Sequence, residues 1–262
     1  MRAQGLAVPS TPIVETRGLS KSFAGYCAVD GVSLSIGQGS IHAIIGPNGA
    51  GKTTFFNLLS GFVVPTSGTV HLAGRDITGL PPHKIARLGM VRSFQINSIF
   101  EHLSVLDNVK VSLEAKTELP SRFWLPSSAT KRLDDRALEL LGDVGLARDA
   151  ERLASHLPYG RKRALELAIS LAQDPAILLL DEPTAGMGTE DVIRITQLIA
   201  RVREGRTVVL VEHNLSVVAN LSDRITVLQR GKVLVEGTYD EVRRDERVID
   251  AYLGGGAAAA HA

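Results

Sequence analysis

A glycine-rich octapeptide, Gly46–Thr53, most constrains the fold of this 262-residue chain, because its pattern G-x-x-x-x-G-K-T lies between two apolar runs. The run before it, Ile41–Ile45, is short and apolar, as in a buried strand, and Thr54–Leu59 after it has the composition of a helix start. In this order, the glycines let backbone N–H groups face an anion, and the positive end of the helix points at the same anion. The sequence therefore predicts a phosphate-binding loop in an α/β P-loop fold.

Two side chains of this loop have the chemistry of nucleotide binding. Lys52 is placed to reach the β- and γ-phosphates, and Thr53 to put its hydroxyl on Mg²⁺. ATP and Mg²⁺ are therefore the expected ligands. The residues of the turn expected to contact the nucleotide are Gly46, Pro47, Asn48, Gly49, Ala50, Gly51, Lys52, Thr53 and Thr54.

The charge balance gives no support for nucleic-acid binding. Lys plus Arg number 29 and Asp plus Glu 28, a net charge of +1, whereas nucleic-acid-binding domains carry a basic excess. The single cysteine, Cys27, has no partner for an internal disulfide and is expected to be a buried small hydrophobe in a reducing compartment. No apolar run approaches the roughly 18–20 residues that span a bilayer, and the N-terminus lacks a secretory signal pattern. We expect a cytoplasmic protein that reaches the inner face of the membrane through a partner.

Hydrophobic periodicity divides the chain into three textures. Residues 12–75 are strand-like, and Val32–Ile36 alternates with period two, as in half-exposed antiparallel strands. Residues 96–165 are mostly helical, interrupted by a loop at 119–128 that packs on its own lobe more plausibly than it docks a partner. From 166 onward helices alternate with buried strands, which indicates a parallel sheet.

A pair of carboxylates, Asp181 and Glu182, ends the apolar run that begins at Ile177. Successive side chains of a strand point in opposite directions, so the two acids can do different work. Asp181 suits the Mg²⁺ shell, and Glu182 suits the orientation or deprotonation of an attacking water.

Two further residues complete the expected catalytic set. His213 follows the apolar run Val208–Val211, where its imidazole can donate a hydrogen bond to the γ-phosphate or to the water. Gln95 lies where the strand-rich part meets the helical part, and its neutral amide can meet Mg²⁺ and the water. At that boundary, contact with the γ-phosphate can also move one lobe relative to the other.

A second glycine-bearing turn, Leu157–Arg161, opens another helix and so makes a second anion-binding N-terminus. One triphosphate rarely needs two such sites within one chain. Two copies facing head to tail need both, because each phosphate is then held by the loop of one and the helix start of the other.

Together these motifs resemble the ATP-binding subunit of ABC transporters, over roughly residues 12–253. The resemblance assigns Gly46–Thr53 as Walker A, Gln95 as the Q-loop, Leu157–Arg161 as the signature sequence, Ile177–Glu182 as Walker B and His213 as the switch histidine. It implies one domain with an ABC-type P-loop core, an antiparallel β subdomain and a helical subdomain at about 96–165, flanked by flexible tails at 1–11 and 254–262.

The resemblance also implies further ligand contacts and partners. Phe23 matches the position that stacks on adenine, with Tyr26 as the runner-up, and Pro158, Tyr159 and Gly160 contact the nucleotide of the opposite subunit. The expected partners are a second ATPase subunit, identical or related, two membrane permease subunits and, through them, an external substrate-binding protein. No nucleic-acid partner is expected.

Four segments are similar to the branched-chain amino acid importer subfamily, namely 89–95, 157–160, 184–187 and 251–254. Urea or amide import and lipid export stay open as alternatives. Two departures from the family pattern, Pro158 for a serine and Gly188 for an aspartate, keep a weakly hydrolysing, nucleotide-gated regulatory module open as well.

Overall fold

The computed structural model describes residues 12–93, 99–116 and 127–257, which form two sheets and the helices that cover them. The larger sheet has the strand order β10-β9-β3-β8-β7-β6, with β10 antiparallel to β9 and the other strands parallel. Its strands are β3 (Ile41–Ile45), β6 (Met90–Arg92), β7 (Ile177–Asp181), β8 (Thr207–Val211), β9 (Arg224–Gln229) and β10 (Lys232–Gly237). The parallel sheet expected from the continuous apolar runs is thereby confirmed.

The central strands of this sheet are buried on both faces, and alternate side chains enter two different cores. In β7, Leu178 and Leu180 pack into the core that the helical part shares, whereas Ile177 and Leu179 pack into the core on the opposite face. Strand side chains alternate between faces. The ligand-bearing ends of β3, β7 and β8 are therefore held from both sides.

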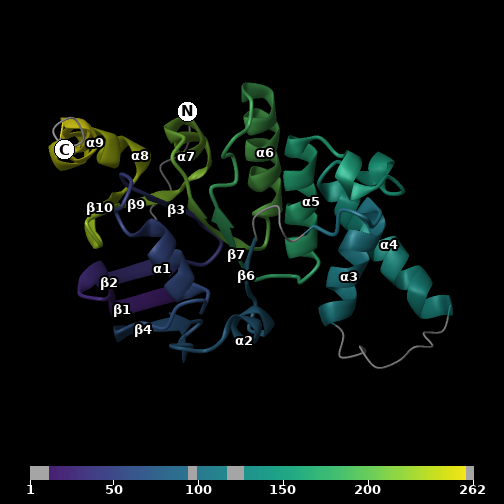
Figure 1. The fold of residues 1–262 in the computed structure, drawn as a ribbon, viewed down its shortest axis with the longest axis horizontal. Helices are drawn as coiled ribbons and strands as arrows, with labels where there is room; N and C mark the ends of the chain where they lie inside the picture. The colour runs from purple at the N-terminus through teal and green to yellow at the C-terminus, as the bar shows by residue number, and fades with distance from the viewer. Residues whose placement is uncertain (1–11, 94–98, 117–126, 258–262) are drawn as a thin grey trace.

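The smaller sheet is antiparallel, as the alternation of Val32–Ile36 predicts, with order β2-β1-β4-β5. Its strands are β1 (Pro12–Phe23), β2 (Tyr26–Gly37), β4 (Ser67–Leu72) and β5 (Arg75–Asp76). Helix α1 (Lys52–Leu59) lies beside it in Figure 1, and Phe55, Phe56 and Leu59 join the core between the two sheets.

The prediction for Cys27 is wrong, because this side chain is exposed. It follows the tight β1–β2 turn, where Phe23 pairs with Tyr26, and this end of the hairpin lies at the surface. The thiol donates a hydrogen bond to the Val29 carbonyl at 3.2 Å.

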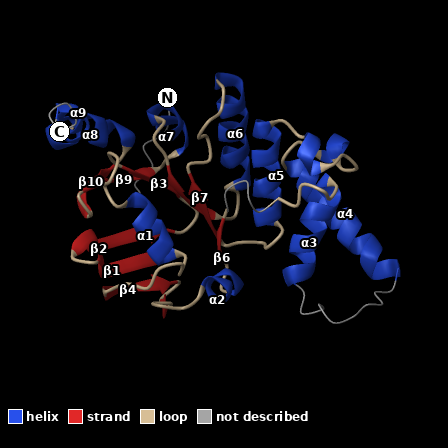
Figure 2. Cartoon of the chain, viewed as in Figure 1, coloured by secondary structure: helices blue, strands red, loops and turns tan. Residues whose placement is uncertain are grey.

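Helices gather at the opposite end of the molecule from the antiparallel sheet (Figures 1 and 2). They are α3 (Val105–Lys116), α4 (Ser127–Asp143) and α5 (Tyr159–Leu171), and α6 (Thr189–Val202) lies beside them over the parallel sheet. The hydroxyl of Ser104 accepts the Asp107 N–H at 3.0 Å and so caps the start of α3. The loop with Trp124, expected at 119–128, lies largely outside the described residues, and α4 begins at its end.

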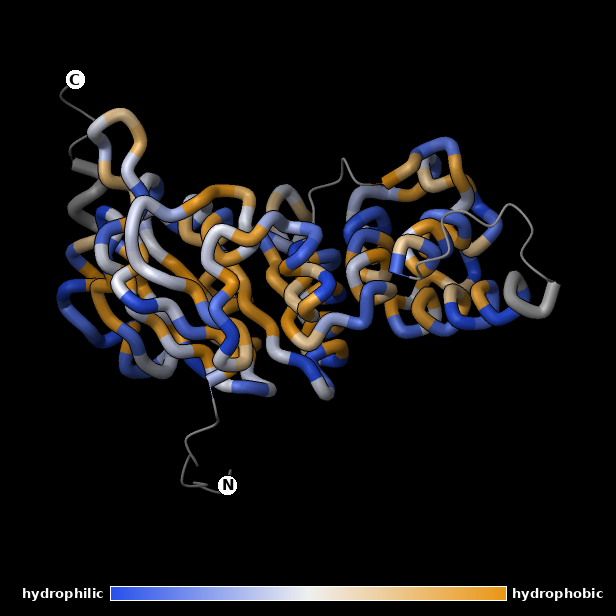
Figure 3. Tube along the Cα trace, turned by 90° about the horizontal axis from the view of Figure 1, so that it is seen from below, coloured by the Kyte–Doolittle hydropathy of each residue, from blue (hydrophilic) through white to orange (hydrophobic). Residues whose placement is uncertain are grey.

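The remaining helices are α2 (Pro82–Arg87), α7 (Leu215–Leu221), α8 (Tyr239–Arg244) and α9 (Glu246–Ala257). A capping box at Thr238 and Glu241 begins α8. Helix α9 ends at Ala257, four residues past the boundary expected at 253, and Val248 and Ala251 of its earlier turns are buried. In Figure 3, hydrophobic stretches of the chain run through the interior, and many hydrophilic stretches lie at the outside. Within the described ranges, no helix has the length and apolarity to cross a bilayer.

Candidate nucleotide site

The loop between β3 and α1 is fixed by glycines with left-handed backbone. Gly46 has φ +151° and Gly51 has φ +97°. A Cβ on Gly46 would lie 2.1 Å from the Leu228 carbonyl oxygen, and one on Gly51 would lie 2.3 Å from that of Ala28. Both positions therefore exclude any larger residue, since neighbouring backbone closes on them.

The Lys52 side chain folds back into its own loop. It is 6% exposed, and Nζ donates hydrogen bonds to the carbonyl oxygens of Gly46 at 2.7 Å and Pro47 at 3.0 Å. Burial lowers the pKa of Lys52, while the charges of Glu182 and Asp181 act in the opposite direction. The ammonium is thus held at the centre of a turn that has the geometry to surround a phosphate.

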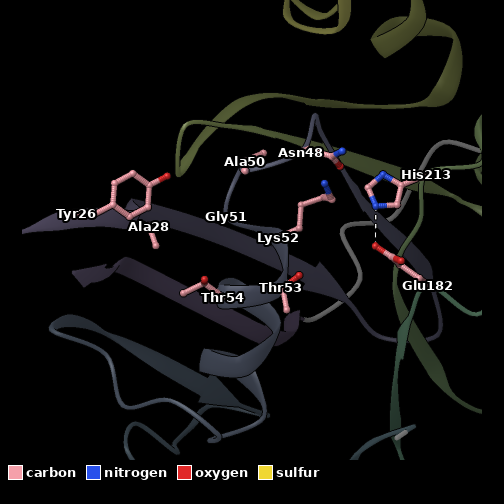
Figure 4. Close-up of a pocket in the computed structure, with 11 residues that line it drawn as sticks. Tyr26, Ala28, Asn48, Ala50, Gly51, Lys52, Thr53, Thr54, Glu182 and His213 are labelled. Carbon is pink, nitrogen blue, oxygen red and sulfur yellow. Dashed lines mark hydrogen bonds and ion pairs between the residues drawn. The ribbon is translucent and has the colours of Figure 1, made fainter. Parts of the chain in front are cut away.

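A pocket of about 260 Å³ lies beside this loop (Figure 4). It joins segments that are far apart in the sequence: Tyr26 and Ala28 from β2, Asn48 to Thr54 from the loop and α1, and Glu182 and His213 from the ends of β7 and β8. The structure thus brings the predicted phosphate loop together with two of the predicted catalytic residues.

Glu182 and His213 form a direct pair in the wall of the pocket. The His213 Nε2 lies 2.6 Å from Glu182 Oε1 (Figure 4). Glu182 has φ +48°, and its N–H donates to the Val211 carbonyl at 2.9 Å, so the turn after β7 is tied to the end of β8. A non-glycine residue in this left-handed region is uncommon, and such strain concentrates at functional sites.

Asp181 is held by Arg92, a residue that the sequence reasoning missed. The Arg92 Nη2 lies 2.5 Å from Asp181 Oδ2, and both side chains are mostly buried. Nη1 of the same guanidinium donates to Asn57 Oδ1 at 2.6 Å, which ties β6 to α1. Because β6 pairs with β7, this arginine reaches the carboxylate across the sheet.

The residues expected to bind Mg²⁺ supply few ligands, which fits a cation whose other ligands are phosphate oxygens and water molecules. Thr53 supplies a hydroxyl and Asp181 a carboxylate, both hard oxygen donors, and the third expected ligand, Gln95, lies outside the described residues. Over those residues, no group of three His, Cys, Asp or Glu side chains is arranged to hold a metal alone.

Of the two aromatic residues expected near adenine, Tyr26 lines the pocket and Phe23 is not among its lining residues. The two are paired at the end of the β1–β2 hairpin, and both are exposed. The ammonium of Lys21 lies 5.0 Å from the Phe23 ring centroid. Tyr26 therefore has the more direct geometry for contact with a base held by this loop.

The second glycine-bearing turn opens a helix as predicted, with Pro158 as the N-cap of α5. Pro158, Tyr159 and Gly160 are not among the residues that line the phosphate-loop pocket. The structure thus leaves the two expected anion-binding turns apart within one chain.

Glu212, next to His213, is a second functional candidate that the sequence reasoning missed. Its carboxylate is 3% exposed and accepts hydrogen bonds from Thr184 on one oxygen and from the His213 and Asn214 N–H groups on the other. The sequence signal for Glu212 was its position as an acidic residue directly after a buried strand, where a charge needs hydrogen-bond partners.

Comparison with known proteins identifies the family of this fold and site. The profile described as "ABC transporter" matches residues 29–185, and one described as "Branched-chain amino acid ATP-binding cassette transporter" matches residues 232–258. The chain belongs to the ABC transporter family. As an ABC ATPase, it couples ATP hydrolysis to transport, as the motifs predicted.

Full-length relatives support the same assignment for this ABC ATPase. It is 42% identical to the high-affinity branched-chain amino acid transport ATP-binding protein LivG of Salmonella typhimurium, over 94% of this chain and 99% of that protein. It is 41% identical to the corresponding protein BraF of Pseudomonas aeruginosa, with the same coverage. The crystal structure of the ADP conformation of MJ1267, an ATP-binding cassette of an ABC transporter, superposes with a TM-score of 0.84 at 29% identity, covering 94% of this chain and all of that one. The predicted ABC-type fold is therefore confirmed.

Proposed function

We propose that this ABC ATPase energises the import of branched-chain amino acids, with ATP held between its own phosphate loop and the α5 start of a second cassette. The observation that carries the proposal is the pocket in which the phosphate loop, Glu182 and His213 meet. LivG and BraF, which match nearly the whole chain, are branched-chain amino acid transport proteins by name.

In the proposed reaction, Glu182 accepts a proton from water while the water oxygen bonds to the γ-phosphorus. The bond from that phosphorus to the β–γ bridging oxygen breaks, and ADP leaves with the electron pair. His213, 2.6 Å from Glu182, orients the carboxylate and donates to a γ-phosphate oxygen. Lys52 and the loop N–H groups hold the β- and γ-phosphates in line with the water.

The cation would be held by Thr53, Asp181 and Gln95. Bound Mg²⁺ neutralises phosphate charge and polarises the γ-phosphoryl group. Asp181 already faces a cation, the Arg92 guanidinium at 2.5 Å. The mostly buried Asp181 carboxylate is thus stabilised by a positive charge. A divalent cation would supply positive charge to the same carboxylate.

Tyr26, with Phe23 beside it, is proposed to contact adenine from the hairpin end of the pocket. In the second cassette, Pro158, Tyr159 and Gly160 would face the γ-phosphate with backbone groups and the positive end of α5. Pro158 supplies no N–H and no hydroxyl, so the following residues carry this contact. The second cassette is a copy of this chain or a related subunit, and two permeases with an external binding protein complete the proposed importer at the inner membrane face.

The test is transport by vesicles that contain this chain with its co-purifying membrane partners and binding protein. With ATP on the cassette side, labelled leucine, isoleucine or valine should accumulate, and urea should not. The matched control carries Glu182→Gln, which should bind ATP without supporting accumulation. Urea uptake, lipid export, or ATP binding without phosphate release would each overturn the proposal in favour of one alternative.

A further inference from the structure

The segment Pro183–Gly188, between β7 and α6, is held on two sides by side chains outside it. It follows directly on Glu182 and leads into the N-terminus of α6. One side is fixed by Glu212, which precedes His213. The other is fixed by Tyr159, the first residue of α5. We call Pro183–Gly188 the connecting segment.

On the first side, Glu212 binds the connecting segment and the residues after β8 with separate oxygens. Oε1 accepts the Thr184 N–H at 3.0 Å and the Thr184 hydroxyl at 2.6 Å. Oε2 accepts the N–H groups of His213 at 3.0 Å and Asn214 at 3.2 Å. Bonds from four donors satisfy this buried carboxylate, and charge-assisted bonds of this kind are short and strong. Glu212 thereby fixes the backbone next to both members of the Glu182–His213 pair.

On the second side, the Tyr159 hydroxyl donates to the Ala185 carbonyl at 3.0 Å. Arg163, one turn along α5, donates to the same hydroxyl at 3.2 Å, and its guanidinium carbon lies 5.5 Å from the ring centroid. Arg163 is in turn anchored by buried Glu166 at 2.9 Å. The ring of Tyr159 is therefore held in one orientation against the connecting segment.

These contacts form one continuous path within a single chain. It runs from the α5 start through Tyr159 to Ala185, then from Thr184 through Glu212 to His213, and His213 contacts Glu182. Ala185 and Thr184 are joined by a peptide bond and the other steps are hydrogen bonds, so a shift of the α5 start can reach the pair without a change in the phosphate loop.

We propose that Glu212 and Tyr159 are positioning residues that make the geometry of the Glu182–His213 pair depend on the position of the same chain's α5 start. The proposal rests on the proposed function, in which this pair acts on ATP in the chain's own pocket while its α5 start contacts the ATP of the other cassette. Engagement of one nucleotide at α5 would thereby align the catalytic pair that faces the other.

Conservative substitutions can break the hydrogen bonds of this path without creating a cavity. The glutamine in Glu212→Gln has one acceptor oxygen and one NH₂ group. In either orientation the NH₂ group faces N–H donors, so the hydrogen bonds on one side of the residue are lost. Tyr159→Phe removes only the hydroxyl. Matched controls are Glu241→Gln and Tyr239→Phe on α8, outside the pocket and the path.

Steady-state hydrolysis and ATP affinity are measured for each variant with the partner subunits present. Glu212→Gln and Tyr159→Phe should each lower kcat by about tenfold while the Kd for ATP stays within about twofold, since the loop contacts are intact. In a Glu182→Gln background neither should lower the residual rate further, because both act through that residue. Thr184→Val should lower kcat like Glu212→Gln, and Thr184→Ser should restore it.

A second readout does not depend on turnover. The ¹⁵N resonances of the His213 ring, identified by their absence in His213→Gln, should move in Glu212→Gln and Tyr159→Phe and stay in place in the two controls. Wild-type kcat in both variants, additive losses in the Glu182→Gln background, or unmoved His213 resonances would overturn the proposal. A wild type that released no phosphate would overturn the proposed function, and the His213 resonances would still decide this inference.

Discussion

The two glycine-bearing turns that open α1 and α5 are alike in sequence order and different in structure. The first, Gly46–Thr53, encloses a buried lysine, has glycines at positive φ and borders a pocket that also contains the Glu182–His213 pair. The second begins at Pro158, has an exposed tyrosine, and is not part of that pocket.

This difference bears on the proposal that a single chain completes only one half of the nucleotide site. The residues that surround the first turn all come from one chain, because β3, β7 and β8 lie side by side and end at the same edge of the sheet. The second turn is joined to the connecting segment after β7 by the hydrogen bond from the Tyr159 hydroxyl to the Ala185 carbonyl. In the proposed function, one chain presents a complete phosphate loop and a helix start that contacts the nucleotide of a second cassette, and the predictions below test each half.

The largest expected effect comes from Glu182→Gln, which removes the proposed proton acceptor and leaves the phosphate loop intact. Phosphate release should fall by about 100-fold or more, the range for loss of a general base, while ATP affinity stays near that of the wild type. The control is Glu190→Gln on α6, a highly exposed side chain outside the pocket. Wild-type turnover in Glu182→Gln would remove this residue from the catalytic role.

Gly46→Ala should break the loop half directly. The added Cβ would lie 2.1 Å from the Leu228 carbonyl oxygen at a positive φ, so loop and sheet cannot both keep their positions. ATP affinity, measured by calorimetry, should fall by about 100-fold, a loss of about 2.7 kcal/mol. Gly142→Ala in α4 is the control, because its Cβ meets open space. Equal affinities for the two variants would contradict the described loop.

Arg92→Met tests whether the Asp181 carboxylate needs a cation. Without Arg92 the mostly buried carboxylate loses its partner, and the free energy of unfolding should fall by about 3 kcal/mol. MgATP should recover part of this loss, so its stabilising effect in thermal unfolding should be larger in the variant than in the wild type. The exposed Arg194→Met serves as control. A smaller gain from MgATP in Arg92→Met would argue against a cation at Asp181.

The smallest expected effect concerns Glu166, a buried residue of α5. Burial raises the pKa of Glu166 to about 7, against the opposing charge of Arg163. Its unfolded-state pKa is near 4.5, so the folded chain binds this proton more tightly and loses stability as pH rises between the two values. From about pH 5.5 to about pH 8 the loss is about 2 kcal/mol. Glu166→Gln should remove this dependence in chemical unfolding, and an unchanged pH profile would contradict the assignment.

The sequence was most informative where one local pattern determines both structure and chemistry. The Gly46–Thr53 turn and the buried runs that become β7 and β8 were predicted because each depends on neighbours within a few residues. The ABC-type fold followed from the order of these motifs.

The rest depends on contacts that only the folded chain creates. Arg92 reaches Asp181 because β6 lies next to β7, although 89 positions separate the two residues. Tyr159 meets Ala185 through the packing of α5, and Cys27 is exposed because its hairpin end projects from the sheet. No local periodicity encodes these neighbours. The Arg92–Asp181 ion pair, the hydrogen bonds of Glu212 and the position of Tyr26 in the pocket could therefore be found only from the structure.

The central claim, that one active site needs the halves of two cassettes, is tested most directly by the specific ATPase activity of this chain at increasing dilution. The measurement is made with the chain alone and with its co-purifying second cassette, while light scattering reports the mass. The account predicts that phosphate release per cassette falls on dilution, as pairs separate into single chains of 28.0 kDa. A constant rate per cassette, at dilutions where only single chains remain, would contradict it.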